Sequence, residues 1–182
     1  MKRSLSLIMC LLGCLALCLT GMPTWNVRAA EPARKFLQGL RDREYYDTAV
    51  DYLESMKTSR LAPVELKEIL LYEIGVTLIQ ASRAQADMSI REKQLDEAND
   101  ALQRFVGQHP DHPLTSSANA QLGNLLVERA RIKVEQSKKP RVNKAALLAE
   151  AKGIYDDAYK VFARSQAGLK EKLAPMQSGI DP

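Results

Sequence analysis

The chain has 182 residues, a length that suits one domain with an apolar core, and a formal net charge of +4. Lys2, Arg3 and Arg28 supply three of the 26 basic residues, and no acidic residue precedes Glu31. The remaining chain therefore carries 23 basic and 22 acidic residues. This near-neutral balance provides no basic face for a nucleic-acid backbone, so we expect no nucleic-acid partner.

Residues 1–29 are predicted to be a signal peptide. Lys2 and Arg3 precede an uncharged apolar run from Leu5 to Leu19, and Val27-Arg28-Ala29 matches a cleavage site, with cleavage expected after Ala29. The predicted location is the periplasm or the outside of the cell. Two alternatives stay open: a retained anchor, because the apolar stretch approaches the ~18–20 residues of a span, or lipidation at Cys14 in a weak lipoprotein-like box.

The cysteine distribution excludes several chemistries from the rest of the chain. Cys10, Cys14 and Cys18 all lie in the leader, so residues 30–182 have no disulfide, thiol nucleophile or thiolate metal site. The same residues are rich in Ala, Leu, Glu, Lys, Gln and Arg, which favours helix throughout. We predict an all-α domain over residues 30–165, followed by a loose C-terminal tail over residues 166–182.

The first half of this domain predicts a helix pair and then a long helix. Two short helices are expected within residues 31–56, each with apolar residues at steps of three and four. Pro63 suits a first helical turn, and the following helix is expected from Val64 to about Asp87. Residues 89–93 either continue that helix or form a turn. The expected core positions are Phe36, Leu37, Leu40, Tyr46, Ala49, Val50, Leu53, Met56, Leu66, Ile69, Leu70, Ile74, Leu78 and Ile79.

The second half predicts three more helices. The first covers Leu95 to Gly107, where glycine suits a helix end and Pro110 prevents continuation. Thr115 or Ser116 is expected to cap a helix over residues 116–136, and Asn143 a last helix that ends near Ser165. The expected core positions are Leu95, Ala98, Ala101, Leu102, Phe105, Val106, Leu122, Leu125, Leu126, Ala130, Leu147, Leu148, Ala151, Ile154, Tyr155, Ala158 and Phe162.

A weak internal repeat accompanies these helices. Tyr46-Asp47-Thr48-Ala49-Val50 and Leu95-Asp96-Glu97-Ala98-Asn99 take the same place in the second helix of successive pairs. This pattern resembles the tetratricopeptide repeat, in which each unit is two antiparallel helices. The resemblance is most specific over residues 95–127, which are similar to envelope proteins of the outer-membrane-assembly lipoprotein and Tol–Pal coordinator type. It implies a short solenoid of stacked helix pairs, and a non-enzymatic scaffold that binds another protein or peptide of the cell envelope.

Five residues define the expected repeat: Ala49, Gly75, Ala98, Pro110 and Gly123. The family places a small residue where the two helices of a unit touch. This would explain Gly75, which otherwise costs about 1 kcal/mol relative to Ala inside a helix. Gly75 and Ala98 are further apart than the family spacing, so the later units are expected to have lengthened helices or insertions.

No residue constellation predicts catalysis, a cofactor or a metal. His109 and His112 are the only histidines, and a zinc site needs three or four protein ligands that the rest of the chain does not supply. They are better explained as residues of a proline-rich turn. Paired carboxylates such as Asp156 and Asp157 are adjacent in sequence, so on a helix they point about 100° apart. We therefore predict no catalytic, cofactor-binding or metal-ligating residue.

Four tyrosines are the candidate binding residues. Tyr45, Tyr46, Tyr52 and Tyr72 could line a groove for a partner peptide, because tyrosine combines apolar area with a hydrogen-bonding tip. Ordinary packing between helices is the alternative, and it explains them better. Two other functions stay open: a closed helical bundle that holds a small apolar ligand, and the N-terminal arm of a longer protein.

Overall fold

The computed structural model describes residues 30–177, and the predicted signal peptide lies outside this range. The described chain is helical and contains no strand, which confirms the all-α prediction. The helices are α2 (Ala30–Asp42), α3 (Tyr46–Thr58), α4 (Val64–Glu68), α5 (Leu70–Ala84), α6 (Met88–Gln108), α7 (Thr115–Gln136) and α8 (Lys144–Gln177). None of the described helices has the length and hydropathy needed to cross a membrane.

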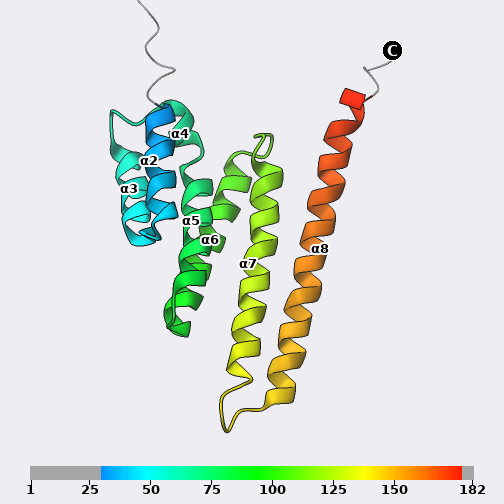
Figure 1. Cartoon of the computed structure of the whole chain (residues 1–182). Coiled ribbons are helices and arrows are strands. Elements are labelled where there is room, and N and C mark those ends of the chain that lie inside the picture. Colours follow the sequence, from blue (N-terminus) through cyan, green and yellow to red (C-terminus); the bar gives the residue numbers. More distant parts are fainter. Residues whose placement is uncertain (1–29, 178–182) are drawn as a thin grey trace, which may run out of the picture.

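The helices form a row of antiparallel pairs, α2 with α3, α5 with α6, and α7 with α8 (Figure 1). Helix α5 is central, because it packs against α3, α4, α6 and α7. Helix α6 joins the second pair to the third through its contact with α7. Helix α8 lies at the end of the row and has its extensive contacts with α7 alone.

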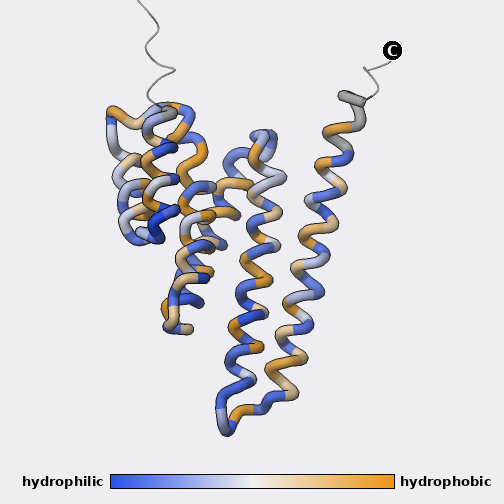
Figure 2. The backbone as a smooth tube through the Cα atoms, viewed as in Figure 1, coloured by the Kyte–Doolittle hydropathy of each residue, from blue (hydrophilic) through white to orange (hydrophobic). Residues whose placement is uncertain are grey.

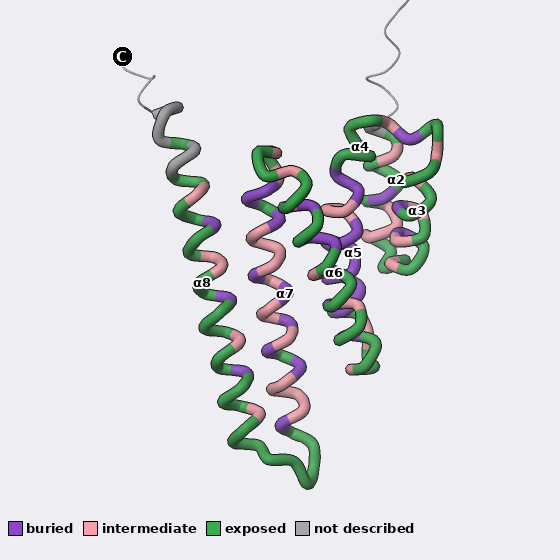
Figure 3. The backbone as a smooth tube through the Cα atoms, turned by 180° about the vertical axis from the view of Figure 1, so that it is seen from behind, coloured by how far each residue is buried: buried purple, intermediate pink, exposed green. Residues whose placement is uncertain are grey.

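The apolar core follows this arrangement. One cluster of buried side chains runs from α2 to α7, with Phe105, Leu102 and Ile79 among its most enclosed members. Helix α5 is buried along most of its length, whereas α8 is exposed apart from regularly spaced positions that face α7 (Figure 3). Apolar residues nevertheless recur along the coloured part of α8 (Figure 2).

The predicted long helix from Val64 to Asp87 is wrong, because the chain breaks at Ile69. Its backbone has φ −108° and ψ 8°, and its N–H donates to the carbonyl of Leu66 at 3.1 Å. The break lets α4 contact α2 while α5 packs against α3 and α6. Residues 89–93 neither continue α5 nor form a turn, but belong to the first turns of α6.

Of three other predicted helix ends, one is confirmed and two are wrong. The side-chain cap expected at Thr115 or Ser116 is wrong: the N-cap position is Leu114, and the Thr115 hydroxyl donates to the His109 carbonyl at 2.6 Å. The Asn143 cap is confirmed, because its Oδ1 accepts from the N–H of Ala146 at 3.1 Å. Helix α8 continues past the predicted end at Ser165 to Gln177, so the expected loose tail is helical in residues 166–177.

Most predicted core positions of α5 and α6 are buried, but three expected core residues are exposed. Phe36 is 54% exposed, Leu148 39% and Tyr155 38%. Phe36 lies edge-on to Tyr52, with ring centroids 4.9 Å apart, near the outside of the first pair. On α8 the reason is topological, since α7 covers only one side of a wide apolar face.

Gly75 and Gly123 both lie where a second helix comes close. A Cβ atom at Gly75 would lie 2.5 Å from Cγ of Leu102 on α6, which confirms the predicted close approach. A Cβ atom at Gly123 would lie 2.6 Å from the Phe162 ring on α8. The wide spacing of Gly75 and Ala98 lies within the helices themselves, because only residues 85–87 separate α5 from α6.

Candidate binding cleft

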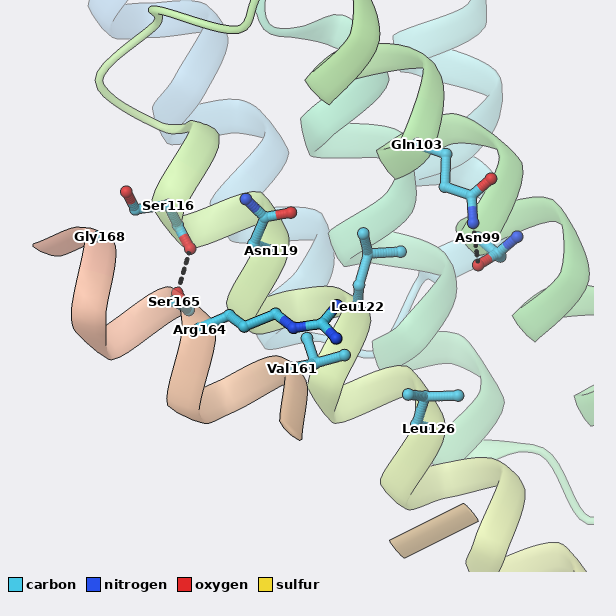
Figure 4. Close-up of a pocket in the computed structure, with 10 residues that line it drawn as sticks. All are labelled: Asn99, Gln103, Ser116, Asn119, Leu122, Leu126, Val161, Arg164, Ser165 and Gly168. Atoms are coloured by element: carbon cyan, nitrogen blue, oxygen red, sulfur yellow. Dashed lines mark hydrogen bonds between the residues drawn. The ribbon is translucent and has the colours of Figure 1, made fainter. Parts of the chain in front are cut away.

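A cleft with a volume of about 380 Å³ lies between the last three helices (Figure 4). Helix α7 forms its floor, and α6 and α8 form its two walls. The floor residues Leu122 and Leu126 are apolar, while most residues around them are polar. The lining consists of Asn99, Gln103, Ser116, Asn119, Leu122, Leu126, Val161, Arg164, Ser165 and Gly168, and we call this set the cleft.

The cleft is held open by the way α8 docks on α7. The Ser165 hydroxyl donates to the Ser116 carbonyl at 2.9 Å in a buried contact, which brings the two backbones together (Figure 4). One turn further along α8, Gly168 presents no side chain, so this end of the cleft is not filled. On the opposite wall, Nε2 of Gln103 donates to Oδ1 of Asn99 at 3.3 Å.

Two polar groups of the cleft have no partner among the described residues. The Asn119 amide and the Arg164 guanidinium take part in no side-chain hydrogen bond or ion pair there. Arg164 extends over α7 toward Leu122, so its positive charge lies above the apolar floor (Figure 4). An amide that can donate and accept, together with a guanidinium fork, suits a peptide backbone and a carboxylate.

The same three helices bound a second hollow further along α7, and two ion pairs form part of its lining. Arg129 on α7 pairs with Asp96 on α6, with Nη2 and Oδ1 2.5 Å apart. Lys133 on α7 pairs with Glu150 on α8, with Nζ and Oε1 3.1 Å apart. No ion pair joins the residues that line the cleft, so its side chains differ in chemistry from those of the second hollow.

The chemistry of the cleft suits binding. Among its ten lining residues Arg164 is the one ionisable group, and the Ser165 hydroxyl is already donated to a backbone carbonyl. Proton transfer needs a base within hydrogen-bond reach of the reacting group, and these residues supply none. No group of three or more His, Cys, Asp or Glu within residues 30–177 is arranged to hold a metal ion.

The four predicted tyrosines are not gathered in one groove. Tyr45 is 58% exposed, whereas Tyr52 packs against Phe36. Tyr46 and Tyr72 line different hollows beside α5. Burial raises the pKa of the Tyr52 phenol, and burial together with the Glu73 carboxylate raises that of Tyr72. Tyr52 and Tyr72 thus contribute to packing.

The two histidines surround Phe105. Its ring centroid lies 5.3 Å from that of His109 and 5.4 Å from that of His112. Nδ1 of His112 accepts from the N–H of Leu114 at 3.1 Å, and the His109 carbonyl accepts from Thr115. Both residues therefore organise the turn between α6 and α7, as the turn interpretation expects.

The five residues that the sequence predicts to define a repeat lie at helix contacts or in turns. Ala49 and Ala98 are fully buried, and Gly75 and Gly123 meet the facing helices. Pro110 lies in the turn after α6. Comparison with protein-family models, curated proteins and solved structures finds no significant match.

Sequence reasoning missed the cleft. Asn99, Gln103 and Asn119 resemble ordinary solvated positions on amphipathic helices, and Arg164 lies at the predicted end of its helix. The available signal was the four-residue spacing of Asn99 and Gln103 beside a buried stripe, which places two amides on one flank of α6. That signal is weak because it does not reveal which helix faces the flank.

Proposed function

We propose that this chain is a non-enzymatic interaction scaffold of the tetratricopeptide-like type, exported to the cell envelope, which binds an extended segment of another protein. The row of antiparallel pairs and the glycine contacts at Gly75 and Gly123 support the repeat assignment. The export assignment rests on the leader in residues 1–29, outside the described part of the chain.

The cleft is the observation that carries the binding proposal. Its apolar floor would accept a small or branched apolar side chain of the bound segment. Asn119, with Asn99 and Gln103, would hydrogen-bond the segment's backbone, and Arg164 would pair with an acidic side chain or a C-terminal carboxylate. The amides favour a polypeptide over a small apolar ligand, because an apolar ligand would leave them without partners.

Site-specific photo-cross-linking tests this proposal. A photoreactive amino acid at Asn119 should give a discrete cross-linked product with a partner protein in the native cells. The same group at Ala167, on the outward side of α8, is the matched control and should give no product. Arg164→Glu should reduce the Asn119 product by roughly 10-fold or more, because it replaces attraction of a carboxylate by repulsion.

Two outcomes would count against the proposal. Equal products from Asn119 and Ala167 would show that contact with the cleft is not selective. A product from Asn119 that is unchanged in the Arg164→Glu variant would contradict recognition of an acidic group. Circular dichroism of each variant checks that the helical content is retained.

A further inference from the structure

Helix α8 has a second apolar stripe, which α7 covers only at Phe162, whose ring packs on Gly123. Its members alternate at steps of four and three residues, the spacing of a coiled-coil seam. Tyr159 is 75% exposed, Leu169 45% and Leu173 50%, so the stripe faces solvent over most of its length. The stripe consists of Tyr155, Tyr159, Phe162, Gln166, Leu169 and Leu173.

This stripe borders the α7 contact, which includes the Phe162 ring, and it is separate from the cleft. Helix α8 meets α7 through a line of small buried residues, Ala151, Ala158 and Ser165. Tyr159 and the cleft residue Arg164 are five residues apart, which is about 140° around a helix. A partner on the stripe would therefore leave the cleft accessible.

The C-terminal end of α8 extends beyond the start of α7, the helix on which α8 packs. The bond between Ser165 and Ser116 places Ser165 beside the first turn of α7. Residues 166–177 continue past that point for about 18 Å at the usual rise per residue. A helical segment of this length is marginal in water unless its apolar face is packed. Leu169 and Leu173 provide such a face and leave it half exposed.

We propose that a second copy of this chain covers the stripe, with the two α8 helices antiparallel. In that arrangement the unsupported end of each α8 packs on the supported part of the partner helix. Tyr159 of each copy faces Leu169 of the other, and Tyr155 faces Leu173. In the central layers Gln166 meets the part of Phe162 that α7 leaves exposed. A two-fold axis makes these layers identical in both directions, as an isologous interface requires.

Charge favours the antiparallel direction. Asp156 and Lys170 each lie one position after a stripe residue, on the same flank of the helix. The antiparallel layers bring Asp156 of one copy opposite Lys170 of the other, twice per dimer. Lys152 already pairs with Asp156 within each helix, at 2.8 Å, so Lys170 adds a second cation to this carboxylate. In a parallel pair, each stripe residue would instead face the same residue of the other copy. Asp156 of one copy would then not lie opposite Lys170 of the other.

The first test measures the dimer and its loss. Sedimentation equilibrium of the purified full-length chain should show a dimer at micromolar concentration. Tyr159→Glu combined with Leu169→Glu should raise the dissociation constant by roughly 100-fold or more, because the symmetric interface buries each charge twice. Both side chains are exposed in the monomer, so its fold is unaffected. Leu61→Glu, at a residue 91% exposed outside α8, is the matched control and should leave the dimer intact.

The second test addresses direction. Asp156→Lys or Lys170→Asp alone should weaken the dimer, since each places like charges opposite one another, and the double variant should restore it. Failure of the double variant to recover the dimer would overturn the antiparallel register. A wild-type chain that stays monomeric, or a dimer that survives Tyr159→Glu with Leu169→Glu, would overturn the proposal as a whole. These outcomes do not depend on whether the cleft binds a peptide.

Discussion

At the scale of single residues, the glycines show how one residue type has different roles. Gly75 and Gly123 are required by close approach, because a Cβ atom at either would overlap a side chain of the facing helix. Gly153, on the exposed side of α8, has no atom within 4 Å of its Cβ position. Sequence alone cannot separate these cases, since all three lie inside helices.

Replacing these glycines by alanine should therefore have opposite effects. Gly75→Ala should lower the free energy of unfolding by about 1–2 kcal/mol, because overlap with Leu102 outweighs the gain in helix propensity. Gly153→Ala should raise it by about 0.5–1 kcal/mol through propensity alone. Urea unfolding followed by circular dichroism measures both. Changes of the same sign would contradict the assigned roles.

Asp87 predicts a local pH dependence at the start of α6. Hydrogen bonds from the Ser89 hydroxyl and from the Ser89 and Ile90 N–H groups lower the pKa of its carboxyl. Because the folded pKa is depressed, the stabilisation is present above the unfolded value of about 3.9 and is lost as pH falls through the folded value. Amide exchange at Ser89 and Ile90, corrected for intrinsic rates, should rise over that range. Asp87→Asn, a cap that does not titrate, should show no such rise.

At the scale of helices, α2 is joined to α5 by one arginine. Nη2 of Arg41 donates to the Glu73 carboxylate at 2.8 Å and to the Glu73 carbonyl at 2.9 Å. Nε and Nη2 both donate to the Thr77 hydroxyl. The side chains of Arg41 and Glu73 are only 10% and 15% exposed, so water replaces these bonds poorly.

Arg41→Lys should lower the free energy of unfolding by about 2 kcal/mol. Lysine keeps the charge but loses the planar fork that reaches three acceptors at once. Arg43→Lys is the matched control: Arg43 lies on the exposed side and donates to the Gly39 carbonyl, so little change is expected. Equal unfolding midpoints for the two variants would show that the buried network contributes nothing specific.

At the scale of the whole molecule, stability is expected to be uneven along the row of helices. The large buried cluster runs from α2 to α7, with α5 and α6 at its centre. Helix α8 packs extensively on α7 alone, and its buried positions Ala151, Ala158 and Ser165 carry small side chains. Local opening should begin where few apolar contacts must be broken.

Native-state hydrogen exchange should reveal this order. In dilute protein, amides of α5 and α6 should exchange most slowly, those in the first two-thirds of α8 faster, and those of residues 166–177 fastest. Phe162→Ala should increase exchange along α8 with little change in α5, because its ring packs on Gly123 outside the central cluster. Uniform protection across all helices would contradict a hierarchy of this kind.

The prediction from sequence succeeded where local pattern and burial agree. The core positions of α5 and α6 were predictable because both helices have partners on the faces that their apolar residues mark. The break at Ile69 was not predictable, since no glycine or proline marks it and its cause is the separate packing of α4 and α5. The exposure of Tyr155 was missed because periodicity marks an apolar face without showing whether a partner covers it.

The sequence by itself determined the helical class, most of the core and the absence of cysteine from residues 30–182, because these depend on local periodicity and composition. Tertiary structure decided which flanks of those helices meet. It placed the amides of α6 and α7 beside Arg164 in one cleft, dispersed the four tyrosines, and left most of the stripe of α8 uncovered. The physical reason is that a site between helices depends on their relative register, which residues distant in sequence set through packing.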